Sequence, residues 1–159
     1  MKFFNRTNLI LLSGLFIVGS YLFFTKTTIG KNMAHKISEN GLNLLKRFEG
    51  FSSKAYWDVK GWSIGFGHFM GQNKLENNIS LERGLTLLMN DLLWVENAIN
   101  KYVKVPLTQN QHDALVSFIY NVGETNFKTS TLLKRLNEGN YKEAANQFLV
   151  WNKCSKKAI

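Results

Sequence analysis

Three side chains that could carry out acid–base chemistry, Glu49, Asp58 and Ser63, lie within fifteen residues of one another. They surround a glycine-containing turn, so local structure can hold two carboxylates and a hydroxyl at short range. Hydrolysis of a glycosidic bond needs two carboxyl groups at a fixed separation. One donates a proton to the leaving oxygen, and the other activates water or attacks the sugar. The spacing therefore makes glycoside hydrolysis a candidate chemistry.

The residues around the two carboxylates predict a different ionisation for each. Glu49 lies between Phe48 and Phe51, and an apolar pocket disfavours the ionised form, so its pKa should be raised and it could act as a general acid. Asp58 begins a polar turn and should stay ionised, and Ser63 could hold a water beside it. Spacing alone leaves a plainer alternative open, because glutamate at a helix end and aspartate in a turn are ordinary surface residues.

The segment that leads to Glu49 is predicted to be a helix. Ser38 is a favourable N-cap, and apolar residues recur after it at helical spacing. Gly50 directly follows Glu49 and is a natural C-cap. Glu49 should therefore end this helix.

The segment that carries Asp58 and Ser63 is predicted to be a hairpin. Residues 55–57 and 62–66 have the composition of two short strands. The four residues 58–61 between them begin with Asp and end with Gly, which suits a type I turn. This hairpin would bring Asp58 and Ser63 near each other.

From residue 80 onward the apolar pattern is that of helices, with Pro106 as a break. The predicted helices cover 81–99, 108–119, 132–136 and 140–151. One small hairpin sheet among many helices is an α+β arrangement. We expect the carboxylates where the first helix meets the hairpin, with the helical remainder forming the other wall of a cleft.

Residues 47–68 resemble the signature of the phage-type lysozymes, glycoside hydrolase family 24. They read RFEGFSSKAYWDVKGWSIGFGH. The family pattern is a glutamate, eight residues, an aspartate, and then a threonine just before an I-G-x-G-H run. Glu49 and Asp58 are separated by eight residues, and residues 64–68 match the run. Similar motifs continue in order downstream, so the resemblance covers about residues 37–151.

The resemblance implies a lysozyme-like fold and a peptidoglycan hydrolase, an N-acetylmuramidase that cleaves the bond between N-acetylmuramic acid and N-acetylglucosamine during cell-wall degradation and host lysis. Glu49 would be the proton donor, Asp58 would activate water or stabilise the positively charged sugar, and Ser63 would position the water. The resemblance implies neither a metal nor another cofactor.

Other positions take expected roles from the same resemblance. Four residues fall where the family lines its sugar cleft and are expected to bind substrate: Phe69, Tyr120, Asn121 and Ser130. Core packing is an equal alternative for the two aromatic members. His68 is expected to be structural, because a histidine can bridge neighbouring elements by hydrogen bonds. The four tryptophans are expected mainly in the core, with Trp57 and Trp62 as alternative substrate contacts.

The sequence also departs from the family pattern. Ser63 stands where the family has threonine, and the turn before it is one residue short. The chain ends soon after Trp151, where family members usually continue into a closing helix, so the C-terminal end is expected to be truncated and Glu49 to lack a basic partner. A lytic transglycosylase of the same fold and a non-catalytic wall-binding or virion structural module therefore remain alternative functions.

The first 36 residues are predicted to be a separate unit before a catalytic domain over 37–159. Residues 7–25 carry no charge, and their strongly apolar part would be about 24 Å long as a helix, against ~30 Å for a hydrocarbon core. A cleaved signal peptide, a signal anchor and a weakly held anchor that later leaves the bilayer all fit, and the missing cleavage site favours an uncleaved membrane segment. We expect the chain to be anchored in the bacterial inner membrane or exported to the periplasm or cell wall.

The formal net charge is +9 and the isoelectric point is about 9.7. Such a charge favours anionic partners, here the acidic wall and the membrane surface, although a merely soluble basic surface is an alternative. The positive residues are not gathered on one helix, which argues against a nucleic-acid partner. Cys154 is the only cysteine, so an intramolecular disulfide is excluded. We expect a monomer that binds the glycan strands of peptidoglycan.

Overall fold

The computed structural model describes residues 36–58 and 61–151, so the anchor predicted over 7–25 lies outside the described residues. No helix in the described part is long and apolar enough to cross a bilayer. The elements, in chain order, are α2 (Glu39–Glu49), β1 (Ser52–Asp58), β2 (Gly61–Gly65), β3 (His68–Gly71), α3 (Leu81–Tyr102), α4 (Gln109–Val122), α5 (Glu124–Lys128), α6 (Thr131–Asn137) and α7 (Tyr141–Trp151). The predicted class, α+β and mostly helical, is confirmed.

The sheet has three strands, so the prediction of a hairpin alone is wrong in this respect. The strands are antiparallel in the order β1-β2-β3. The missed strand β3 has only four residues and pairs His68 with Ile64 and Phe69 with Ser63. A strand this short has too few residues for a periodic pattern, and its formation depends on pairing with β2.

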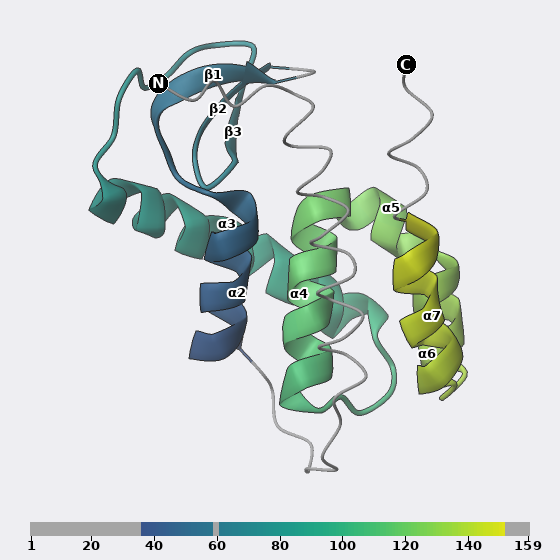
Figure 1. Cartoon of the computed structure of the whole chain (residues 1–159). Coiled ribbons are helices and arrows are strands. Elements are labelled where there is room, and N and C mark those ends of the chain that lie inside the picture. Colours follow the sequence, from purple (N-terminus) through teal and green to yellow (C-terminus); the bar gives the residue numbers. More distant parts are fainter. Residues whose placement is uncertain (1–35, 59–60, 152–159) are drawn as a thin grey trace.

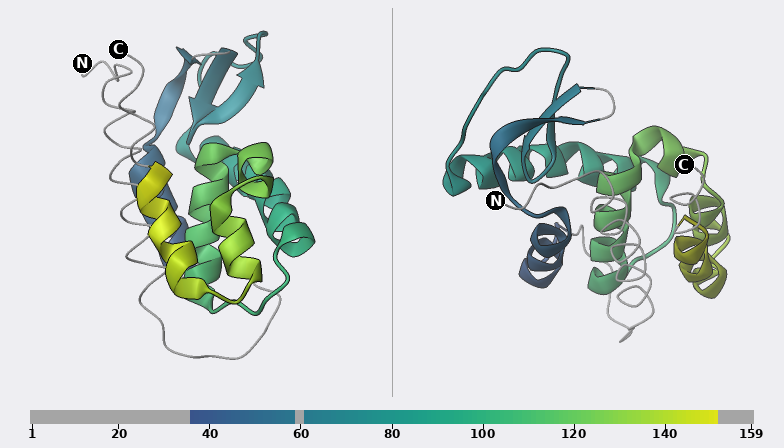
Figure 2. Two further views of the ribbon diagram at one scale, coloured as in Figure 1. Left: turned by 90° about the vertical axis from the view of Figure 1, so that its right-hand side faces the viewer. Right: turned by 45° about the horizontal axis from the view of Figure 1, so that its top comes forward.

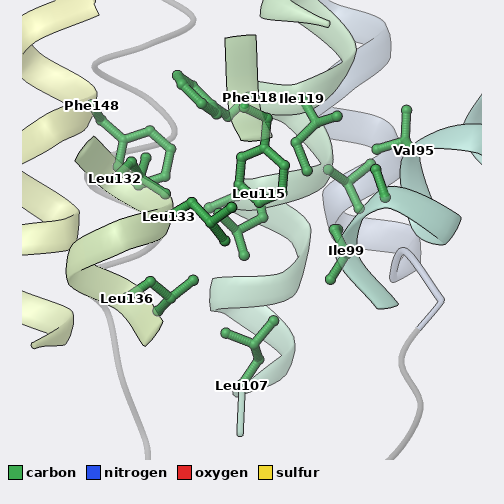
Figure 3. Close-up of a cluster of buried hydrophobic side chains, with 14 of the residues drawn as sticks. Val95, Ile99, Leu107, Leu115, Phe118, Ile119, Leu132, Leu133, Leu136 and Phe148 are labelled. Atoms are coloured by element: carbon green, nitrogen blue, oxygen red, sulfur yellow. The ribbon is translucent and has the colours of Figure 1, made fainter. Parts of the chain in front are cut away.

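The sheet lies at one end of the molecule, and α4 to α7 gather at the other, with α3 in contact with both (Figures 1 and 2). The larger hydrophobic core joins α3, α4, α6 and α7, and Figure 3 shows its side chains meeting around Leu115 and Phe118. A smaller core of Ile64, Met70, Ile79 and Leu87 lies between the sheet and α3. The long helix α3 therefore supports both ends of the molecule.

The helix ends follow the predicted capping chemistry. The Ser38 hydroxyl accepts a hydrogen bond from the backbone N–H of Gly41 at 3.1 Å, and Gly50 ends α2 at a φ of 68°. Thr108 and Gln111 form a capping box at the start of α4, where the predicted helix begins. These local signals fix where α2 begins and ends, and hence where Glu49 lies.

A buried carboxylate, Asp113 of α4, fastens the chain just before α2. Asp113 is 1 % exposed. One of its oxygens accepts hydrogen bonds from the Ser38 backbone N–H at 2.9 Å and from Gln109 Nε2 at 2.8 Å, and the other accepts from the Ser38 hydroxyl. Gly41 permits this approach, because a Cβ there would lie 2.6 Å from Asp113 Cγ. Residues 36–38 and the start of α2 are thereby attached to α4.

The same segment has two further attachments. Glu96 of α3 accepts a hydrogen bond from the Ile37 backbone N–H at 3.0 Å, and Gln109 donates to the Lys36 carbonyl at 2.9 Å. We call the contacts of residues 36–38 with Glu96, Gln109 and Asp113 the entry clamp. Because every bond in it involves backbone or buried polar atoms, the clamp fixes the path by which the chain enters the domain.

Candidate active site

Glu49 is the last residue of α2, and Gly50 lets the chain turn directly after it. Phe48 and Phe51 on either side pack against the larger core, and the ring of Phe51 lies 5.3 Å from that of Phe66. The predicted apolar surroundings of Glu49 are therefore present.

The Glu49 carboxyl faces the glycine-rich turn between β2 and β3. Its Oε2 atom lies 3.5 Å from the position that a Cβ on Gly67 would take, and Gly67 has a φ of 90°, which favours glycine. Although Glu49 keeps some solvent-exposed surface, the dense protein around its carboxyl raises its pKa from 4.5 to about 8 by desolvation. The carboxyl is thus mainly protonated at neutral pH, in the direction that the sequence predicts.

Asp58 ends β1 and pairs with Gly61 of β2. Glycine is required at position 61, because an added Cβ would lie 2.3 Å from the Gly71 carbonyl oxygen and 2.8 Å from Phe69 Cε2. The close approach of three strands at this point therefore places the Phe69 ring over Gly61, beside the partly exposed Asp58. Phe69 is 54 % exposed, so an aromatic face is open to solvent next to this carboxylate.

Ser63 lies on the same face of the sheet as Asp58. It pairs directly with Tyr56, which is two residues before Asp58 on β1, and side chains alternate along a strand. Diagonal neighbours of this kind are about 7 Å apart, a separation at which a water can lie between hydroxyl and carboxylate. Ser63 is 2 % exposed. Although the turn before Ser63 is one residue shorter than in the family pattern, the register places Asp58 and Ser63 on the same face of the sheet.

Tyr56 belongs to this face and was not among the predicted site residues. Burial raises the pKa of its phenol to about 12, and the nearby charges of Asp58 and Glu49 add to the shift. The phenol therefore stays protonated near both carboxylates. The sequence held one signal for it, the two-residue spacing from Asp58 on a predicted strand.

Two of the predicted substrate-binding residues lie at the end of α4. The Tyr120 hydroxyl donates a hydrogen bond to the Phe66 carbonyl at 3.0 Å. Burial raises the pKa of Tyr120, and the charges of Glu49 and Asp91 raise it further, so this residue lies near the acid from the helical side. Asn121 follows it and is exposed.

Ser130, the last of the predicted substrate-binding residues, is the N-cap of α6. It is 8 % exposed and caps α6, accepting from the Leu133 backbone N–H at 3.1 Å and donating to the Phe127 carbonyl at 2.7 Å. These contacts favour a structural role for Ser130, and its role toward substrate stays a prediction.

His68 begins β3 and bridges to α3. Its Nδ1 lies 3.0 and 2.9 Å from the two carboxylate oxygens of Asp91. This contact supports the structural role predicted for His68, whereas Asp91 itself was missed because it lies 23 residues away in the sequence. Across residues 36–58 and 61–151, no group of three His, Cys, Asp or Glu side chains could hold a metal ion.

Taken together, the end of α2, one face of the sheet and the end of α4 place a protonated carboxyl, a second carboxylate, a hydroxyl and two protonated phenols in one region. A protonated carboxyl beside groups that can orient water is suited to splitting an acetal with a proton donor and an activated water.

The sequence model of the phage lysozyme family matches residues 46–159. An endolysin of Salmonella phage P22 is 46 % identical over 129 residues, which cover 76 % of this chain and 86 % of the relative. A SAR-endolysin of Enterobacteria phage P21 is 38 % identical over 104 residues, covering 65 % of this chain and 63 % of the relative.

Solved structures agree with these sequence matches. The muramidase domain of SpmX from Asticaccaulis excentricus superposes with a TM-score of 0.69 at 43 % identity, covering 74 % of this chain and 80 % of that one. A mutant of P22 lysozyme superposes with a TM-score of 0.64 at 46 % identity, covering 74 % of this chain and 84 % of that one. The fold is thus lysozyme-like.

Proposed function

Since the chain belongs to the phage lysozyme family, we propose that Glu49 and Asp58 are the acid and base with which it hydrolyses peptidoglycan. The chain is a muramidase, a glycoside hydrolase of the endolysin type. Glu49 donates its proton to the leaving glycosidic oxygen, and the observation that carries this assignment is its raised pKa of about 8 beside Gly67.

Asp58 and Ser63 act on the other side of the bond. Asp58 activates the attacking water or stabilises the positive charge that develops on the sugar, and Ser63 positions the water. Their common face on the sheet supports this division of roles. Tyr56, which pairs with Ser63, stays neutral and can hydrogen-bond to substrate or water in the same region. Phe69 stacks on a sugar, and the solvent exposure of its ring supports this role.

Hydrolysis can be separated from transglycosylation by its products. A lytic transglycosylase needs one glutamate and no activated water, whereas the shared face of Asp58 and Ser63 provides a place for water. We expect the purified chain to release peptidoglycan fragments with reducing ends, as measured by mass spectrometry. Fragments ending in anhydro sugars would overturn the roles of Asp58 and Ser63, and an absence of cleavage at every pH tested would overturn the enzymatic function.

The N-terminal segment is the basis of a second proposal. Residues 7–25 anchor the chain in the inner membrane and direct the catalytic domain to the periplasm. Support comes from the uncharged sequence of this segment and from relatives named SAR-endolysin, in phages PS119, PA-2 and P21.

A reporter fusion tests this anchor. We expect alkaline phosphatase fused after the last residue of the full chain to be active, because the enzyme needs the periplasm to fold, and N-terminal sequencing to find the segment retained. The matched control is a fusion that lacks residues 7–25, which should be inactive. Equal activity of the two fusions would contradict the proposal.

A further inference from the structure

An exposed aromatic surface lies on the opposite face of the sheet from Asp58. Trp57 and Trp62 are direct partners across β1 and β2, and their rings meet edge to face with centroids 5.6 Å apart. The ammonium group of Lys74 lies 4.5 Å from the centroid of the Trp62 ring. We call Trp57, Trp62 and Lys74 the tryptophan–lysine surface.

Packing does not account for this surface. Trp62 packs on the smaller core, whereas Trp57 is 55 % exposed. Core packing, the main expectation for Trp57, is therefore wrong, and its alternative role as a substrate contact stays a prediction. Leu75, which follows Lys74, is 72 % exposed. An exposed aromatic ring that packs on a second ring, with a cation held on that second ring, is typical of surfaces that bind a partner.

The surface lies behind the proposed catalytic site, on the other side of the edge strand β1. Trp57 directly precedes Asp58 on β1, the outer strand of the sheet, and neighbouring side chains on a strand point to opposite faces. A polymer bound at Asp58 that continues over this edge would meet the Trp57 ring next. The two binding regions are then separated by little more than the thickness of one strand.

From this proximity across one strand we propose that the tryptophan–lysine surface binds a second stretch of the peptidoglycan strand, outside the catalytic site. The proposal rests on the proposed function. Sugar rings present C–H faces that pack on aromatic rings. The ammonium of Lys74, in a chain of formal net charge +9, matches the carboxylates on the peptide stems of the polymer. The surface would hold the enzyme on an extended, insoluble substrate between cleavage events.

Binding and cleavage are tested separately. In the full chain carrying Glu49→Gln, so that the substrate survives, we expect an added Trp57→Ala to weaken binding to purified sacculi about tenfold, and Lys74→Ala to weaken it less. In the catalytically intact chain, Trp57→Ala should slow digestion of sacculi much more than digestion of a short soluble peptidoglycan oligosaccharide. Leu93→Ala, at another exposed apolar residue on α3, is the matched control and should change neither.

Three results would overturn the proposal. The first is that Trp57→Ala binds sacculi as tightly as the control. The second is an equal loss of activity on both substrates, which would place Trp57 in the catalytic site or the fold. The third is a defect confined to binding of anionic phospholipid vesicles, which would make the surface a membrane contact. A failure of the proposed catalytic roles would be recognised separately, because the Glu49→Gln chain would then digest the sacculi during the binding measurement.

Discussion

Replacing Glu49 with glutamine is expected to slow peptidoglycan clearance by a factor of about 10²–10⁴. Glutamine keeps the shape of the side chain but cannot donate a proton to the leaving oxygen. Turbidity clearance of purified peptidoglycan measures the effect. Glu39→Gln, at the exposed start of the same helix, is the control and should keep full activity. Clearance by Glu49→Gln within a few-fold of the unmutated chain would remove Glu49 from the role of proton donor.

The pH dependence of the unmutated chain provides a second check on the same assignment. A general acid works only while protonated, and burial raises the pKa of Glu49 to about 8. The rate should therefore be kept through neutral pH and fall as pH rises through about 8, approaching about tenfold per pH unit. A rate that already falls near pH 5, as for an ordinary glutamate, would show that the carboxyl is not desolvated in the working enzyme.

Asp113→Asn is expected to lower the free energy of unfolding by about 3 kcal/mol at pH 7. Both oxygens of the carboxylate accept from donors of Ser38 and Gln109, and an amide in its place would replace one of these oxygens with an NH2 group that faces a donor. Urea unfolding followed by circular dichroism measures the loss. Glu138→Gln, which breaks the exposed ion pair with Arg135, is the control and should cost well under 1 kcal/mol.

The effect of Asp113 should depend on pH in a defined direction. Burial acts to raise the pKa of Asp113, but interactions with His112, Ser38 and Gln109 outweigh it and hold the pKa below its usual 3.8. A lowered folded-state pKa stabilises the protein above the unfolded value, and this contribution is lost as pH falls through the folded value. The difference between the unmutated chain and Asp113→Asn should thus narrow below about pH 4. A gap that widens in acid would contradict this account.

Local chemistry explains why parts of the fold could be predicted from sequence. The caps Ser38 and Gly50 act within one helical turn, so the position of Glu49 at the end of α2 follows from nearby residues. The apolar neighbours Phe48 and Phe51 likewise predicted the direction in which the pKa of Glu49 is shifted.

The features that could not be predicted depend on contacts between distant segments. Strand β3 and the five-residue helix α5 are too short for a periodic signal. Asp91 joins the site only because α3 crosses the sheet beside His68. The exposure of Trp57 could not be read from its apolar character, because it follows from how far the smaller core extends beneath β1 and β2.

The entry clamp has a mechanical consequence. A pull on the chain ahead of residue 36 is carried through Lys36, Ile37 and Ser38 into α3 and α4, by way of Glu96, Gln109 and Asp113. The load path therefore bypasses most of α2. Tension from a tether would be borne by the helical end of the molecule, and the far end of α2, which carries Glu49, would be shielded from that force.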